Sequence, residues 1–154
     1  MTPSSHTIAF SLNGEPVEAS TEAHVLLIDL LRNAFDLRGV KRSCDMEVCG
    51  ACTVLVDDQP VSSCTMLAVD VDGKTVVTIE GIGSSDNLDP IQKAFLEHGA
   101  LQCGFCTPGF ILATKALLLV NPKPSRDEIV HHLNGNICRC TGYKKIIEAV
   151  ESLV

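Results

Sequence analysis

The sequence predicts an α+β fold, in which a first half of strands and one helix is followed by a second half of helices. Two short alternating segments, Thr7–Leu12 and Pro16–Ala19, flank an Asn-Gly dipeptide and predict a β-hairpin. The β-branched runs Thr53–Val56 and Val76–Ile79 predict two more strands. After the hairpin, Val25–Phe35 has apolar residues at helical spacing and predicts an amphipathic helix.

The second half carries the start signals of four helices. Capping residues and prolines make up most of these signals, which lie at Asp89–Pro90, Thr107–Pro108, Ser125 and Gly142. The second helix is expected to cover Gly109–Val120, because the following Asn-Pro dipeptide stops it. The fourth is expected over Gly142–Leu153. The second half is therefore predicted to be a small helical bundle.

The charge of the chain is unevenly distributed. Residues 1–83 contain 5 Lys and Arg against 12 Asp and Glu, net −7, whereas residues 84–154 contain 7 of each, net zero. Glu80–Pro90 is rich in Gly, Ser, Asp and Pro, which is typical of a linker. We therefore expect one domain over residues 1–80, a linker over 81–90 and a second domain over 91–154.

Composition narrows the class of protein. A net charge of −7, no Trp, one Tyr and five Phe argue against a nucleic-acid partner. The first twelve residues lack the features of a secretory signal. The longest apolar stretch, Phe110–Val120, is interrupted by Lys115 and is too short to span a bilayer, so no membrane insertion is expected. We expect a cytoplasmic protein, where eight reduced cysteines indicate metal ligation or redox chemistry.

The first set of cysteines has the spacing of a 2Fe–2S site. Its members are Cys44, Cys49, Cys52 and Cys64. The pattern C-x4-C-x2-C with a distant fourth cysteine is that of plant-type ferredoxins. Three thiolates on one loop can surround a compact inorganic core, and the fourth closes it from a neighbouring segment. Gly50 and Ala51 are small, so backbone N–H groups can approach the cluster sulfides.

The second set of cysteines consists of two short motifs. Its members are Cys103, Cys106, Cys138 and Cys140. We expect the C-x2-C motif to ligate one iron of a second 2Fe–2S cluster and the C-x-C motif to ligate the other. Cys106 directly precedes a predicted helix start, where the helix dipole favours a thiolate over a thiol.

Other interpretations of the cysteines remain open at this point. Zinc also takes four thiolates, but structural zinc cysteines usually come in paired knuckles, which the first set lacks. Cys103 and Cys106 before a helix fit a thioredoxin-type dithiol, although this leaves Cys138 and Cys140 unexplained. Buried, inert cysteines are a third alternative, and two complete ligand sets argue against it.

Three segments contain the most specific motifs, namely Cys44–Val54, Gln102–Gly109 and Gly135–Tyr143. They read CDMEVCGACTV, QCGFCTPG and GNICRCTGY. With these motifs in this order, the chain resembles the small iron–sulfur subunits of the xanthine oxidase family of molybdenum hydroxylases. The resemblance runs from about Ile8 to the C-terminus.

This resemblance implies an N-terminal β-grasp domain, similar to plant-type ferredoxins, and a C-terminal four-helix bundle domain, each with one 2Fe–2S cluster. It also implies two partners, a large molybdopterin-binding subunit and a medium FAD-binding subunit, in a heterotrimer or a dimer of heterotrimers. Electrons are then expected to pass from molybdopterin to the C-terminal cluster, the N-terminal cluster and FAD. Gln102 matches the position that contacts the pterin, with Cys140 near it. The chain alone is expected to have no substrate-converting active site.

The sequence departs from the family pattern at three positions. Ser43 and Glu47 stand where glycine is common, and Asp89 replaces a frequent histidine. Glu47 adds negative charge near an anionic cluster and is expected to favour its oxidised form. Three cations, Arg38, Lys41 and Arg42, precede the first cysteine loop and either offset cluster charge or are ordinary surface residues.

Two functions from different classes compete with the relay subunit. A free-standing two-cluster ferredoxin-like carrier is the main alternative, but a second cluster is useful mainly for extending a fixed electron path. A zinc-bound structural module is the other. Copurification with molybdenum and flavin chains would favour the relay subunit, and iron analysis would exclude zinc.

Overall fold

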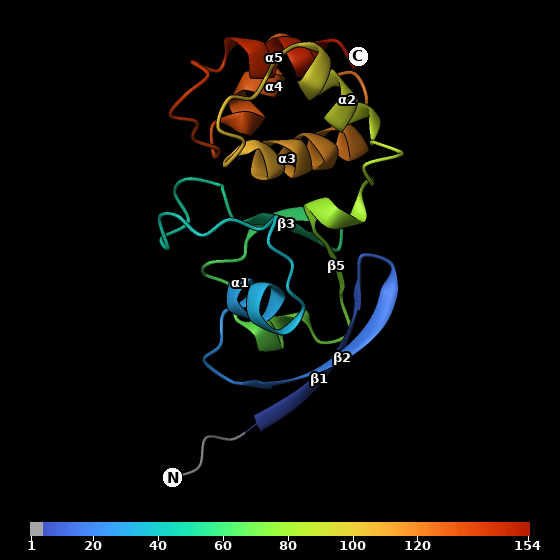
Figure 1. The fold of residues 1–154 in the computed structure, drawn as a ribbon, viewed down its shortest axis with the longest axis vertical. Helices are drawn as coiled ribbons and strands as arrows, with labels where there is room; N and C mark the ends of the chain where they lie inside the picture. Colours follow the sequence, from blue (N-terminus) through green and yellow to red (C-terminus); the bar gives the residue numbers. More distant parts are fainter. Residues whose placement is uncertain (1–4) are drawn as a thin grey trace.

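The first half of the molecule is built on a mixed five-stranded sheet (Figure 1). The computed structural model describes residues 5–154, so residues 1–4 of the segment examined for a secretory signal lie outside it. The strands follow the order β2-β1-β5-β3-β4. Their bounds are β1 Ser5–Leu12, β2 Glu15–Glu22, β3 Thr53–Val56, β4 Gln59–Ser62 and β5 Thr75–Val77. β1 and β5 are parallel, and the other neighbouring strands are antiparallel.

The sequence predicts one of the two hairpins of the sheet and not the other. Asn13 and Gly14 both have positive φ, at 54° and 90°, as the turn between β1 and β2 requires, so the first predicted hairpin is confirmed. The turn between β3 and β4 also has positive φ, at Asp57 and Asp58. β4 was not predicted, because an Asp-Asp pair lacks the glycine that marks such a turn.

The remaining elements of the first half are short. The predicted helix over Val25–Phe35 is present as α1 Leu27–Asp29 followed by a π-helical turn at Leu30–Ala34. Two 3₁₀ turns cover Ala68–Val71 and Ile79–Gly81. The strand expected over Val76–Ile79 therefore ends earlier, at the end of β5.

Four helices make up most of the second half. They are α2 Pro90–Glu97, α3 Thr107–Val120, α4 Arg126–Leu133 and α5 Lys144–Glu151. Asp89 and Ser125 form capping boxes before α2 and α4, as their positions predicted. α5 begins later than expected because Gly142 and Tyr143 are left-handed, with φ of 63° and 67°.

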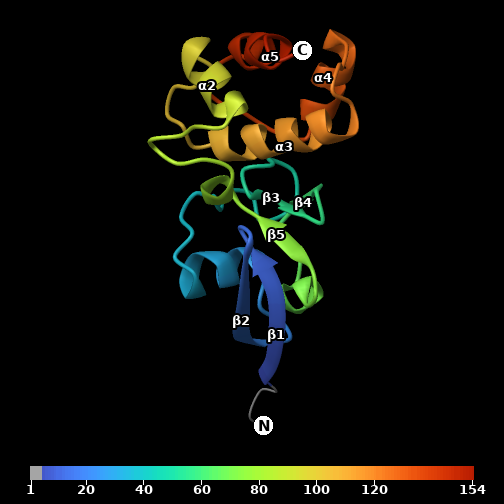
Figure 2. The same ribbon diagram turned by 90° about the vertical axis from the view of Figure 1, so that its right-hand side faces the viewer.

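Helix α3 joins the two halves. One apolar core lies between the sheet and α1, and a second lies among the four helices. A third, smaller cluster links β3 to α3 through Leu55, Leu112 and Ala116. All four residues of β3 are buried, because the strand lies between α1 on one side and α3 on the other (Figures 1 and 2).

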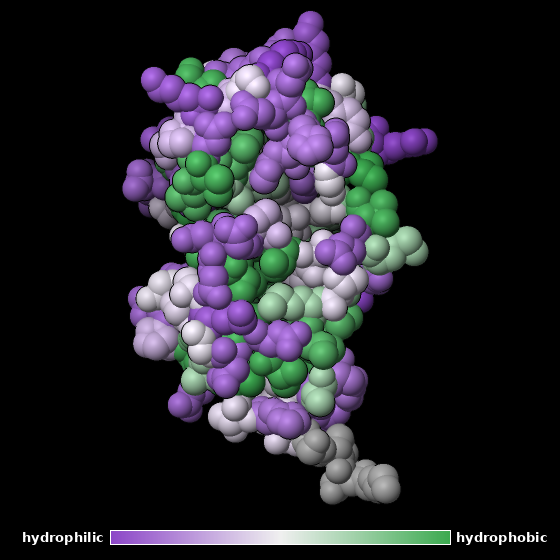
Figure 3. All heavy atoms as spheres, turned by 180° about the vertical axis from the view of Figure 1, so that it is seen from behind, coloured by the Kyte–Doolittle hydropathy of each residue, from purple (hydrophilic) through white to green (hydrophobic). Residues whose placement is uncertain are grey.

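The distribution of polar side chains on the surface is consistent with apolar cores inside the molecule. Seen from behind, hydrophilic side chains cover much of the face, with apolar groups scattered among them (Figure 3). No helix within residues 5–154 is both long enough and apolar enough to cross a membrane.

Candidate metal centres

The first set of cysteines lies at one edge of the sheet. Cys44 and Cys49 occupy the loop before β3, Cys52 directly precedes that strand, and Cys64 follows β4. The side chains interact in two pairs, Cys44 with Cys49 and Cys52 with Cys64. The antiparallel pairing of β3 with β4 brings the distant fourth cysteine of the motif back to the loop.

Backbone donors surround the sulfur of Cys44. Backbone N–H groups of Met46, Val48 and Cys49 point to Cys44 Sγ, and they lower the pKa of its thiol to about 6. The N–H of Val48 lies 3.4 Å from the sulfur. Burial has the opposite effect at Cys52, where it raises the pKa to about 11. The exposed part of the loop is therefore the part that best stabilises a negative sulfur.

The second set of cysteines comes together from two segments, the loop before α3 and the loop between α4 and α5. Its four members, together with Cys49 and Ala51 of the first loop, line a cavity of about 190 Å³. The sulfur atoms of Cys103 and Cys140 are 3.6 Å apart, and the side chain of Cys106 interacts with that of Cys138. Each pair thus takes one cysteine from each motif, whereas the sequence suggested one iron per motif; which two cysteines share an iron stays a prediction.

The pKa of Cys106 also differs from the sequence-based expectation. Burial, together with the neighbouring sulfur of Cys138, raises the pKa of this thiol to about 12. The Cys106 side chain makes no capping hydrogen bond at the start of α3, so the helix start does not offset this effect. The pKa of Cys138, in contrast, is lowered.

Cys138 has the most hydrogen-bond donors of the second set. Burial favours its neutral thiol, but donors from Thr141 and Cys140 outweigh burial and lower its pKa. The hydroxyl of Thr141 lies 3.0 Å from Cys138 Sγ, and the backbone N–H groups of Thr141 and Cys140 are each 3.4 Å away. The N–H of Cys138 itself donates to the phenol oxygen of Tyr143 at 3.1 Å.

The two cysteine loops are in direct contact on the same side of the molecule (Figure 1). The backbone N–H of Ile137 donates to the carbonyl oxygen of Cys49 at 2.9 Å. Ile137 precedes Cys138, so this hydrogen bond joins a cysteine of the first set to the neighbour of a cysteine of the second.

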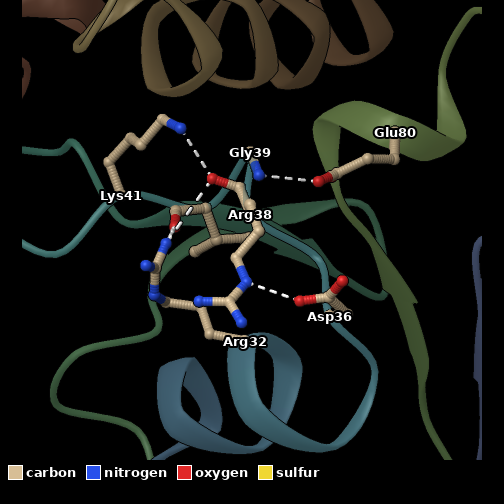
Figure 4. A network of polar contacts seen from close by, with 7 residues as sticks. Arg32, Asp36, Arg38, Gly39, Lys41 and Glu80 are labelled. Carbon is tan, nitrogen blue, oxygen red and sulfur yellow. Dashed lines mark hydrogen bonds and ion pairs between the residues drawn. The ribbon is translucent and has the colours of Figure 1, made fainter.

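A network of polar contacts anchors the segment that leads into the first loop (Figure 4). Arg32 donates to the carbonyl of Val40 at 2.6 Å, and Lys41 donates to the carbonyl of Arg38 at 2.7 Å. The N–H of Gly39 donates to Glu80, and Arg38 pairs with Asp36.

Arg42 binds two carboxylates next to this network, Asp29 at 2.7 Å and Asp45 at 2.9 Å. The charge of Arg42 is thus balanced by acids rather than directed at a sulfur. The three cations before the loop mainly hold its entry in place.

The donor set suits a binuclear cluster better than a single ion. A tetrahedral metal with sulfur ligands at about 2.3 Å separates neighbouring sulfurs by about 3.8 Å. The 3.6 Å between Cys103 and Cys140 is close to this value. Among residues 5–154, no three His, Cys, Asp or Glu side chains converge on one point as ligands of one ion. Sulfurs grouped in twos match a cluster in which each iron has two protein ligands.

Gln102 lies on the surface beside the second set. Its Nε2 donates to the backbone carbonyl of Cys140 at 3.0 Å, and both residues are exposed. The two residues that the family resemblance places near the pterin are therefore adjacent here.

Comparison with known proteins assigns the family. Residues 10–78 match the 2Fe-2S iron-sulfur cluster binding domain, and residues 78–151 match the 2Fe-2S binding domain. The chain is 49% identical over 148 residues to the nicotinate dehydrogenase small FeS subunit of Eubacterium barkeri, which covers 96% of this chain and 94% of that one. The chain belongs to the small iron–sulfur subunits of the molybdenum hydroxylases.

Further similarities support this iron–sulfur subunit assignment. The nicotine 6-hydroxylase small subunit of Paenarthrobacter nicotinovorans is 46% identical, with 93% of this chain and 86% of that relative covered. The crystal structure of quinoline 2-oxidoreductase from Pseudomonas putida 86 matches with a TM-score of 0.92 and 42% identity, over 96% of this chain and 91% of that chain. The subunit is an electron-transfer component of an oxidoreductase, and its first half is a ferredoxin-like β-grasp.

Sequence reasoning gave no role to three residues of the site. Asn136, Thr141 and Tyr143 all contact the cysteine loops through side-chain hydrogen bonds. All three belong to the segment Gly135–Tyr143, which was singled out as a motif. Their sequence signal was their position, because polar residues within one to five positions of the C-x-C cysteines can reach the cysteine loops.

Proposed function

We propose that this subunit holds one 2Fe–2S cluster on each set of four cysteines and carries single electrons between two partner subunits. The first cluster would have the ligands Cys44, Cys49, Cys52 and Cys64. The second would have Cys103, Cys106, Cys138 and Cys140. Each cluster, when bound, accepts and releases one electron at a time.

The observation that carries this proposal is the direct contact between the two loops. The hydrogen bond from Ile137 N to Cys49 O spans 2.9 Å and leaves only the Ile137–Cys138 peptide before the second set. Close contact between the two ligand loops favours electron transfer between separate clusters. Two unrelated metal sites would need no such connection.

We further propose which face meets which partner. Gln102, Cys103 and Cys140 are exposed at the edge of the second half, which supports docking of a large molybdopterin-binding subunit there, with Gln102 contacting the pterin. The exposed loop around Cys44 then faces a medium FAD-binding subunit. Electrons enter the chain at the second set of cysteines and leave it at the first. The complex is a heterotrimer or a dimer of heterotrimers in the cytoplasm.

The domain organisation is part of the same proposal. Residues 1–80 form the ferredoxin-like domain, residues 81–90 the linker and residues 91–154 a four-helix bundle. Each half has its own apolar core, which supports this division. The cluster of Leu55, Leu112 and Ala116 between the halves supports a fixed distance between the two sites.

Metal analysis and spectroscopy test the proposal. The anaerobically isolated chain should contain about four irons and about four acid-labile sulfides, and reduction should give two distinct EPR signals. Cys64→Ser should abolish one signal and Cys140→Ser the other. Copurification with chains that contain molybdenum and flavin is expected for the wild-type subunit. Zinc in place of iron, or cysteines joined in disulfides, would refute the proposal.

A further inference from the structure

Asn136 lies where three backbone segments of the molecule meet. It belongs to the loop between α4 and α5, and it faces both the first cysteine loop and the start of α3. The residue is only 6% exposed, although its side chain is polar. A buried amide needs partners for its polar atoms, and this one finds a partner 86 positions away along the chain.

The partner of Asn136 is the carbonyl oxygen of Gly50. Asn136 Nδ2 donates to it at 3.1 Å, and the backbone N–H and hydroxyl of Thr53 donate to the same oxygen at 3.2 and 2.8 Å. If the Asn136 amide is removed, the Gly50 carbonyl therefore keeps its two hydrogen bonds from Thr53. Of these three donors to the Gly50 carbonyl, only Asn136 Nδ2 belongs to the second half of the chain.

The backbones around this contact approach one another closely. A Cβ on Gly109 at the start of α3 would lie 2.2 Å from the oxygen of Gly50. A Cβ on Gly50, whose φ is +66°, would lie 2.4 Å from Asn136 Nδ2. Both positions require glycine, so the two halves touch here with no space to spare.

The next hydrogen bond along both segments is the one between Ile137 N and Cys49 O. Asn136 and Ile137 are adjacent, as are Cys49 and Gly50, so the side-chain contact and the backbone contact run side by side. The amide of Asn136 thus fixes the register in which the two cysteine loops face each other.

We infer that Asn136 is a positioning residue for electron transfer between the two clusters. This inference rests on the proposed function and adds a residue that touches neither set of sulfurs. Electron tunnelling weakens steeply as the donor and acceptor separate or lose hydrogen-bonded contact. Loss of the Asn136 amide loosens the Cys49–Ile137 contact and slows transfer, while the ligands of each cluster stay in place.

The test uses the full chain with both clusters assembled and compares Asn136→Leu with the wild type. Leucine is of similar size but has no donor. After photoreduction of a fraction of the clusters, electron redistribution between them is followed by absorbance, and the magnetic interaction between the fully reduced clusters by EPR. We expect redistribution to slow several-fold and the magnetic splitting to shrink, with the iron content and both midpoint potentials unchanged.

Two further variants make the test specific. Gly109→Ala places a methyl group against the Gly50 carbonyl from the side of α3. It should displace this carbonyl and slow electron redistribution in the same way. Gly135→Ala is the control, because a Cβ there meets nothing within 4 Å, and it should leave the rate unchanged.

Three results would overturn the inference. The first is a wild-type rate in Asn136→Leu with full iron content, and the second is a slowing fully explained by shifted midpoint potentials. The third is a wild-type chain that holds fewer than two clusters, which would refute the proposed function as well. Both clusters present without any dependence on Asn136 would refute this inference alone.

Discussion

Single residues control how much negative charge each site can hold. Backbone N–H groups donate to the sulfurs of both Cys44 and Cys138, but of these two sulfurs only Cys138 also receives a hydrogen bond from a hydroxyl, that of Thr141. Reduction adds negative charge to a cluster, and hydrogen bonds to its sulfurs stabilise that charge. We therefore expect Thr141 to tune the C-terminal cluster without affecting the N-terminal one.

Replacing Thr141 with valine removes this hydroxyl and keeps the side-chain shape. The midpoint potential of the C-terminal cluster should fall, because the reduced form loses a hydrogen bond at Cys138 Sγ. A redox titration followed by EPR measures both clusters in one sample, so the N-terminal cluster serves as the internal reference. Thr141→Ser keeps the hydroxyl and should stay near the wild type. An unchanged or higher potential in Thr141→Val would contradict this role.

Glu47 is expected to act on the N-terminal cluster through its charge. It takes φ of +60° in the first cysteine loop, and its carboxylate accepts a hydrogen bond from Thr65 at 3.3 Å, next to Cys64. Glu47→Gln should raise the midpoint potential of the N-terminal cluster, because it removes a negative charge near an anionic site. Glu18→Gln on β2 makes the same change in net charge far from the loop. Equal shifts in both variants would show that only net charge matters.

At the scale of elements, Asp89 connects two helices. Its Oδ1 accepts from the backbone N–H of Ile91 at 2.9 Å and caps α2, and its Oδ2 pairs with Lys115 of α3 at 2.9 Å. Asp89 is only 11% exposed, so water screens this ion pair less than one at the surface. The residue that replaces a frequent histidine thus has two structural roles.

Two substitutions separate these roles. Asp89→Asn keeps a capping oxygen and loses the ion pair, so it should lower the free energy of unfolding by about 1 kcal/mol. Asp89→Ala loses both and should lower it by about 2 kcal/mol. Urea titration of the cluster-loaded chain, followed by far-UV circular dichroism, measures both. Equal losses in the two variants would mean that the cap contributes nothing.

Elements were predictable where a local signal marks them. The Asn-Gly turn of the first hairpin and the capping residues Asp89 and Ser125 were visible in the sequence, and the structure has all of them. β4 was missed because Asp57 and Asp58 adopt positive φ without glycine. Such a turn depends on tertiary pairing of the strands, which no local pattern records.

The cysteine sets were predictable from spacing, but their internal pairing was not. Spacing within one segment cannot show which sulfur of a distant segment comes nearest. The pairing of Cys103 with Cys140 depends on how the loops before α3 and α5 approach each other. The contact of Asn136 with Gly50 has the same origin, since it joins the two halves of the chain.

At the scale of the whole molecule, α3 makes the two halves one structure. Its inner face belongs to the helical core, and Leu112 and Ala116 pack against Leu55 of β3. Asn136 and Ile137 make hydrogen bonds to the first cysteine loop at this boundary, whereas the apolar contact is continuous with the buried strand β3. We therefore expect the halves to unfold together and the distance between the two sites to be fixed by packing.

Truncation of the fully buried Leu112 to alanine tests this coupling. The change leaves a cavity between β3 and α3 and should lower the free energy of unfolding by about 3 kcal/mol. If the halves are coupled, far-UV circular dichroism and the visible absorbance of both clusters should shift to the same lower urea concentration. Leu119→Ala is the matched control, because Leu119 lies on the same helix but is 54% exposed and should cost less than about 0.5 kcal/mol. Loss of one cluster well before the other in the wild-type chain would show instead that each half unfolds by itself, and that α3 does not bind them into a single cooperative unit.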